Sequence, residues 1–90
     1  MTLVRLAKSE SVILTLLAAR RDAYGLELVE ASRGRLKRGG IYVTLGRMEE
    51  KGLVSSRAGD SGRRLYKPTA LGERALLAAR ILAGQITLKA

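Results

Sequence analysis

The sequence contains no cysteine and no histidine, and it also lacks tryptophan and phenylalanine. The absence of cysteine excludes disulfide bonds and thiolate metal sites, and the absence of histidine removes the commonest metal ligand and general base. We therefore expect neither a metal site nor a cofactor. Because the only aromatic residues are three tyrosines, the core is expected to be built from aliphatic side chains.

Long apolar runs are missing as well. No stretch reaches the roughly 18 apolar residues that a membrane-spanning helix requires, and residues 1–6 lack the apolar segment of a signal peptide. We therefore expect a soluble, cytoplasmic protein that does not bind membranes. The 90 residues, 47% of them hydrophobic, predict a single globular domain over residues 1–90.

Positive charge is concentrated in the middle of the chain. Residues 33–67 hold ten Arg and Lys against three acidic residues, whereas residues 1–32 hold four of each. The formal net charge of +9 therefore comes mainly from one segment. Because neutralising phosphates releases counterions from nucleic acid, a localised basic surface indicates a nucleic-acid partner. A solvated charged face without a partner is the alternative.

The hydrophobic pattern predicts four helices and one hairpin. The helices are expected at about residues 9–21, 23–32, 40–51 and 70–84. Ser9 or Ser11 is expected to cap the first helix, Asp22 the second and Thr69 the last, and Gly52 is expected to end the third helix in the left-handed conformation. Two runs of strand length, 53–57 and 63–67, flank a turn at 58–62. The predicted fold class is mainly α with a small β-hairpin, in the order of a winged helix-turn-helix protein.

The third predicted helix has two distinct faces. Ile41, Leu45 and Met48 recur at the i, i+4 and i+7 spacing of a buried stripe. At 100° per residue, Val43, Gly46, Arg47 and Glu50 lie on the opposite side, with Tyr42 and Lys51 at its flanks. This opposite side is the candidate surface for reading DNA.

The candidate DNA-contacting residues come from three segments: the basic loop before the third helix, the helix itself and the second strand. They are Arg35, Lys37, Arg38, Tyr42, Val43, Arg47, Lys51, Arg63, Arg64 and Lys67. Arg47 is the first choice for a base contact, because a guanidinium can donate two hydrogen bonds to guanine. Tyr42 either donates to a phosphate or packs its ring under the hairpin, and Glu50 is expected to pair with Arg47 or Lys51.

The last predicted helix carries apolar residues on two stripes. Leu71, Ala75, Ala78 and Leu82 form one stripe, which suffices for the core of the domain, and Leu77 and Ile81 lie about a quarter turn away. A second apolar stripe on a small protein is typical of an interface. We therefore expect a C-terminal dimerisation helix at about residues 69–90, with Leu77 and Ile81 in a homodimer interface. Coverage of both stripes by residues 1–7 is the alternative.

The segment from Gly39 to Val54 resembles the signature of the PadR family of bacterial transcriptional regulators. The matching pattern is a small residue, an aliphatic residue, Tyr42, then Leu45, Met48, Glu49 and the run Gly52-Leu53-Val54. Matches at 13–18, 24–28 and 63–72 extend the resemblance to about residues 12–76. The chain departs from the usual family pattern at Gly40, where Ser or Thr is common, and at Val43, where Pro is common.

The resemblance implies a dimeric winged helix protein that binds double-stranded DNA, with the third helix in the major groove and the wing on phosphate or minor groove. It also implies a transcriptional repressor, and for many relatives a small hydrophobic effector. A winged helix used for protein assembly or RNA binding is the alternative function. An enzyme is disfavoured, because Glu49, Glu50 and Asp60 lie on patterns that indicate solvent-facing positions.

Overall fold

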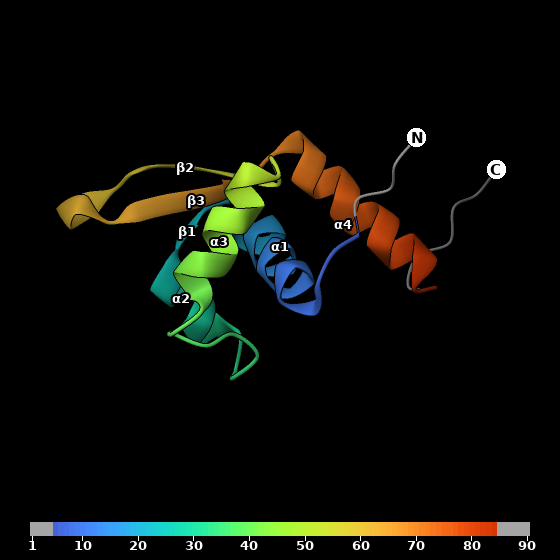
Figure 1. The fold of residues 1–90 in the computed structure, drawn as a ribbon, viewed down its shortest axis with the longest axis horizontal. Helices are drawn as coiled ribbons and strands as arrows, with labels where there is room; N and C mark the ends of the chain where they lie inside the picture. The colour runs from blue at the N-terminus through green and yellow to red at the C-terminus, as the bar shows by residue number, and fades with distance from the viewer. Residues whose placement is uncertain (1–4, 85–90) are drawn as a thin grey trace.

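The computed structural model describes residues 5–84 of the chain. The elements follow the order α1 (Lys8–Arg20), β1 (Ala23–Tyr24), α2 (Gly25–Ala31), α3 (Ile41–Glu50), β2 (Val54–Ala58), a 3₁₀ turn (Asp60–Gly62), β3 (Arg64–Pro68) and α4 (Ala70–Leu82). Figure 1 shows the β2–β3 hairpin extending at one end and α4 at the other, with α1, α2 and α3 between them. The architecture is the winged helix-turn-helix expected from the sequence, mainly helical with a small sheet.

The core is aliphatic, as the composition predicts, except for Tyr66. Ile13, Leu14 and Leu17 of α1 are at most 1% exposed, so α1 is the central helix. The predicted inner stripe of α3 is confirmed, because its three residues are at most 2% exposed. The other core residues are Ala23, Leu28, Leu36, Leu53, Val54, Tyr66, Ala75 and Leu76.

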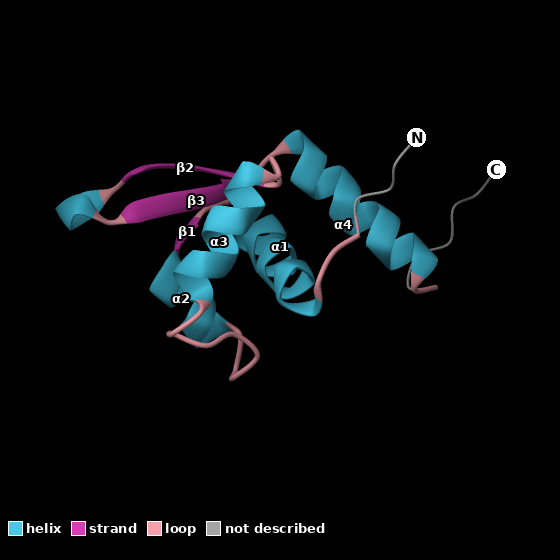
Figure 2. Ribbon diagram, viewed as in Figure 1, coloured by secondary structure: helices cyan, strands magenta, loops and turns pink. Residues whose placement is uncertain are grey.

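The sheet has three antiparallel strands in the order β1–β3–β2, where the sequence predicted two (Figure 2). The additional strand β1 pairs Ala23 with Tyr66 and Tyr24 with Leu65. The helical spacing of apolar residues continues back to Tyr24, so the pattern placed the start of the second helix two residues early. The side chain of Glu27 accepts a hydrogen bond from the Tyr24 amide (2.8 Å), and the helix begins only at Gly25.

The predicted serine and aspartate caps are wrong. The first helix already begins at Lys8, and Glu10 Oε1 accepts a hydrogen bond from the Ala7 amide (2.8 Å), so Ser9 and Ser11 lie inside the helix. Asp22 instead forms an ion pair with Arg57 of β2, with 3.1 Å between the charged atoms. A carboxylate at the third position of a helix can accept a hydrogen bond from the backbone amide of the residue that precedes the helix. Glu10 does so here, and a serine cap is therefore unnecessary.

The end of α3 and the start of α4 are joined closely. Gly52 has φ +79°, the left-handed geometry expected of a residue that terminates a helix. Thr69 caps α4 as predicted, because its Oγ1 accepts a hydrogen bond from the Gly72 amide (3.0 Å) and donates one to the Gly52 carbonyl. A Cβ at Gly72 would lie 2.1 Å from the Leu53 carbonyl oxygen, so only glycine fits there.

The core-facing side of α4 differs from the predicted stripe. Ala75 and Leu76 are buried, whereas Leu71 and Leu82, which were expected in the core, are 37% and 75% exposed. The buried side of α4 differs from the predicted stripe because Gly72 contacts the backbone at Leu53. This close contact determines which side of the helix faces the core. Residues 1–4, part of the segment that could cover the two apolar stripes, lie outside the described residues. Residues 85–90, the end of the expected dimerisation helix, lie outside them too.

Candidate nucleic-acid interface

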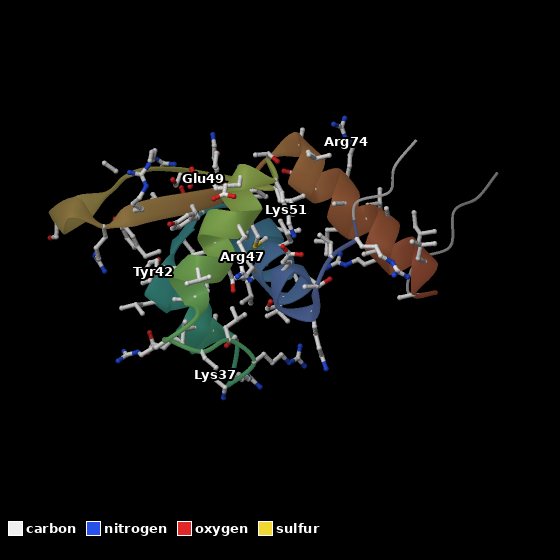
Figure 3. All side chains as sticks on the ribbon, viewed as in Figure 1. Lys37, Tyr42, Arg47, Glu49, Lys51 and Arg74 are labelled. Atoms are coloured by element: carbon white, nitrogen blue, oxygen red, sulfur yellow. The ribbon has the colours of Figure 1, made fainter. Side chains whose placement is uncertain are left out.

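The outer face of α3 is exposed along the length of the helix. Tyr42 is 51% exposed and Val43 57% exposed, and Arg47 also lies on the surface. Figure 3 shows Tyr42 on the α2 side of α3, Arg47 and Lys51 on the α1 side, and Glu49 toward the wing. Tyr42 and Lys51, which the sequence placed at the flanks of the outer face, thus lie toward opposite edges of it, with Arg47 on the Lys51 side.

Tyr42 packs over the start of α2. A Cβ at Gly25 would lie 2.8 Å from Tyr42 Cε1, so the ring rests directly on the glycine backbone. This contact explains why a glycine occurs at a helical position that disfavours it. The ring therefore does not lie under the wing, which was one of the two sequence-based expectations. The second expectation, a phosphate contact, stays a prediction, and Tyr42 is exposed enough to make such a contact.

The basic loop between α2 and α3 is anchored by one serine. Ser32 Oγ accepts a hydrogen bond from the Leu36 amide (2.9 Å) and donates one to the Val29 carbonyl (2.7 Å), and Leu36 inserts into the core. The three predicted contact residues of this loop, Arg35, Lys37 and Arg38, are all exposed. The loop thus presents its cations immediately before the N-terminus of α3, where the helix dipole favours an anion.

The tip of the wing is held by Tyr24. The Arg63 guanidinium lies over the Tyr24 ring, 4.2 Å from its centroid, and the Asp60 amide donates a hydrogen bond to the Tyr24 hydroxyl (3.0 Å). The backbone at Gly59 passes so close to this ring that a Cβ there would lie 2.6 Å from the Tyr24 hydroxyl oxygen. Arg63 remains exposed, so the stacking fixes its position without removing it from the surface.

A polar chain connects the wing to α3. Arg64 Nε donates a hydrogen bond to Ser56 Oγ (2.9 Å), and Ser56 Oγ donates one to Glu49 Oε2 (2.8 Å). The three residues belong to β3, β2 and α3 respectively. Arg64 and Lys67 are exposed. The wing therefore has a defined position relative to the outer face of α3.

Lys51 is paired with a buried carboxylate. Its Nζ donates a hydrogen bond to Glu10 Oε2 (2.8 Å), and Glu10 is only 4% exposed. Burial by itself raises the pKa of Glu10, but the hydrogen bonds from Lys51 and the Ala7 amide, with the positive charges of Lys51 and Arg47, outweigh burial and leave this pKa below its ordinary value. The partner of Lys51 is thus Glu10 of α1 and not the expected Glu50.

The outer surface of α4 is apolar in part. Leu77 is 45% exposed and Ile81 is half-buried. A groove of about 560 Å³ runs between α1, β3 and α4, and Leu14, Leu76 and Leu77 form part of its wall. The two residues predicted for a dimer interface thus lie on the described part of α4.

The sequence did not reveal Glu10, Tyr24 or Ser56 as parts of this surface. Each acts through a partner in or directly after a different helix or strand, 7 to 41 positions away in the chain, and periodicity gives no signal for contacts between elements. Across residues 5–84, no group of three acidic residues is arranged to hold a metal ion. No helix in that part of the chain is long and apolar enough to cross a membrane.

Known proteins share both the sequence pattern and the fold of this chain. A family model described as the transcriptional regulator PadR-like family matches residues 13–78. RosR of H. salinarum is 26% identical, with 99% of this chain and 84% of that chain covered and a TM-score of 0.76. The complex structure of hsRosR-S4 is 27% identical, with 94% and 77% covered and a TM-score of 0.74.

A more distant structure has the same fold. The PcaV transcriptional regulator from Streptomyces coelicolor, solved with its natural ligand, is 18% identical, with 91% of this chain and 64% of that chain covered and a TM-score of 0.71. No protein of curated function gives a significant match. Because the family model covers most of the residues and the wing and third helix are present, the chain belongs to the PadR-like family of transcriptional regulators and is a DNA-binding regulator.

Proposed function

We propose that the chain acts as a homodimeric repressor that places α3 in the major groove of double-stranded DNA and the β2–β3 wing on phosphate or in the minor groove. The observation that carries this proposal is the placement of the exposed face of α3 between two basic segments. The basic loop leads directly into its N-terminus, and the chain from Arg64 through Ser56 to Glu49 ties the wing to its C-terminal half.

The proposed contacts divide into two groups. Arg47 and Val43 are the base-contacting residues, because a guanidinium suits guanine and an apolar side chain suits the thymine methyl group. The residues proposed to contact the DNA backbone are Arg35, Lys37, Arg38, Tyr42, Arg63, Arg64 and Lys67. Phosphate contacts position a protein on the duplex, whereas base contacts supply the sequence preference.

The proposed dimer uses α4. Leu77 and Ile81 provide apolar surface that the described part of the chain leaves partly uncovered, and a two-fold axis would pair each copy of this surface with the other. Two α3 helices separated by about 34 Å would then bind half-sites one helical turn apart. A palindromic operator follows from this geometry.

A small hydrophobic effector is a separate proposal about the same dimer. The groove between α1, β3 and α4 borders Leu77, so a ligand bound there would contact the dimer helix. Binding that changes how α4 pairs would change the spacing of the two α3 helices. The test is a titration of the protein–operator complex with small apolar compounds, in which dissociation supports the proposal and an unchanged complex contradicts it.

The central experiment is selection of duplex DNA from a random-site pool, followed by fluorescence anisotropy titrations at increasing salt. We expect an enriched palindromic sequence and an affinity that falls steeply with salt, with a log–log slope of about −0.9 for each phosphate contact. A flat salt response, or tighter binding to duplex RNA than to duplex DNA, would contradict the proposal. The second result would favour an RNA-binding role instead.

A further inference from the structure

Glu10 is the only buried charged side chain among residues 5–84. It lies in the first turn of α1, and both of its carboxylate oxygens are engaged: Oε1 by the Ala7 amide and Oε2 by the ammonium of Lys51, each at 2.8 Å. Lys51 follows the last residue of α3, and its side chain is 49% exposed. The pair therefore joins the start of the central helix to the end of the helix that faces DNA.

This pair changes what Lys51 can contribute to binding. A phosphate contact by Lys51 would either move its ammonium away from Glu10 and leave a buried carboxylate without its charged partner, or use an ammonium whose charge Glu10 already neutralises. Breaking a buried pair in this way is costly, whereas one exposed phosphate contact gains little in comparison. Lys51 should therefore remain on Glu10 when the protein binds DNA, and its charge should not be available to the phosphates.

Arg47 lies on the same edge of α3 in Figure 3, and its positive charge also stabilises the ionised form of Glu10. In contrast to Lys51, Arg47 forms no ion pair with Glu10. One cation at this edge is thus held back by Glu10, and the other remains exposed for base contact.

We propose that Glu10 is a positioning residue that determines specificity, because it seats the C-terminal end of α3 and withholds Lys51 from the phosphates. This inference rests on the proposed placement of α3 in the major groove. It assigns Lys51 to the support of α3, although the charge pattern of the sequence placed it among the DNA contacts. If Lys51 stays paired with Glu10, the α1 side of α3 adds little electrostatic attraction to DNA of arbitrary sequence.

The main test compares Glu10→Gln with the wild type on a random-sequence duplex and on the selected operator. Removing the negative charge frees Lys51 for phosphate, so the log–log salt slope on random DNA should steepen by about 0.9 per protomer. Affinity for random DNA should rise, and affinity for the operator should rise less or fall, because α3 is less firmly seated. Glu30→Gln is the matched control, since it removes an exposed carboxylate from α2 and leaves Lys51 paired.

The double variant Glu10→Gln with Lys51→Gln removes the pair without changing the net charge. Its slope on random DNA should equal that of the wild type, and Lys51→Arg should also leave the slope unchanged because the ion pair is retained. A slope for the double variant that is shallower than the wild type by about 0.9 would show that Lys51 already contacts phosphate, and it would overturn the proposal. An unchanged slope for Glu10→Gln would also overturn it.

The failure of this inference is distinguishable from the failure of the proposed function. If the wild type bound no duplex, or bound it without salt dependence, the placement of α3 in the groove would be wrong before any variant was compared. If the wild type bound as expected and the salt slopes of the four variants did not follow the pattern above, only the role of Glu10 would be wrong. Urea unfolding of the same variants checks that each is folded under the binding conditions.

Discussion

The helices α3 and α4 distribute their apolar residues in different ways. In α3, Ile41, Leu45 and Met48 are at most 2% exposed, while Tyr42 and Val43 on the other side are more than half exposed. Only one stripe of α3 is needed for the core, and its exposed side carries a guanidinium, two carboxylates, a phenol and one aliphatic side chain. Such a face suits a polar, hydrogen-bonding partner.

The apolar residues of α4 are placed on more than one side. Ala75 and Leu76 are buried against the domain, but Leu71, Leu77 and Leu82 are 37%, 45% and 75% exposed. The helix therefore carries more apolar surface than the described part of the domain covers. The core of the monomer buries the inner side of α3, whereas α4 keeps apolar side chains exposed, and we propose that another copy of the chain covers them.

The largest expected effect concerns this apolar surface. Leu77→Glu combined with Ile81→Glu places four carboxylates in the proposed symmetric interface and removes four apolar side chains from it. We expect dimerisation to weaken by roughly 4 kcal/mol or more, about a thousandfold in Kd, and specific operator binding to be lost while weak non-specific binding persists. Analytical ultracentrifugation measures the change. A wild type that is already monomeric at micromolar concentration would reject the interface.

The next effect concerns the joint between the two helices. Gly72→Ala forces a Cβ toward the Leu53 carbonyl oxygen, where the present geometry allows only 2.1 Å. We expect the free energy of unfolding to fall by about 3 kcal/mol, measured by urea denaturation. Gly46→Ala within α3 is the control, because a Cβ there meets no atom within 4 Å, and it should stabilise the protein by roughly 0.5–1 kcal/mol.

A smaller effect separates the face of α3 from the wing. Arg47→Ala should cost roughly 1–3 kcal/mol at one or two operator positions and relax the preference there. Arg63→Ala with Arg64→Ala should instead weaken binding to all sequences alike and make the salt slope shallower. Binding to a panel of single-base operator variants distinguishes the two. If the wing variant changed the sequence preference and Arg47→Ala did not, the assigned roles would be reversed.

The smallest effect is a dependence of stability on pH. The pKa of Glu10 in the folded protein is below the ordinary value of 4.5, so ionised Glu10 stabilises the fold above that pH, and this contribution is lost as pH falls from 4.5 through the folded-state pKa. Wild type and Glu10→Gln should therefore differ in unfolding free energy at neutral pH and converge in acid. A difference that stayed constant down to low pH would mean that the stabilisation does not come from the ionised carboxylate.

Much of the fold could be predicted from the sequence, because it depends on local periodicity. The inner stripe of α3, the left-handed Gly52 and the Thr69 cap follow from residue types at fixed spacings, and the structure confirms all three. The order of helices and hairpin followed from the same signals. The bounds of α3 differed from the prediction by one residue at each end.

The missed cap of α1 is local, because Glu10 binds the Ala7 amide three residues earlier, but other misses concern pairs that are distant in sequence. Strand β1 exists because Ala23 and Tyr24 meet β3, and two residues are too few to show a strand pattern. The inward side of α4 is fixed by the contact between Gly72 and the Leu53 carbonyl, which no hydrophobic pattern records. Lys51 was predicted to contact DNA or to pair with Glu50, because its actual partner, Glu10, is 41 positions away.

The three tyrosines also have an optical consequence. The chain has no tryptophan to take up tyrosine emission by energy transfer, so each tyrosine can report on its own surroundings. Tyr66 is buried in the core, Tyr24 lies beneath the guanidinium of Arg63, and Tyr42 stands half exposed on α3. Ultraviolet fluorescence of the unlabelled protein should therefore change when DNA stacks against or quenches Tyr42, and Tyr42→Phe should remove that part of the signal. The surface proposed to bind DNA thus carries its own spectroscopic probe.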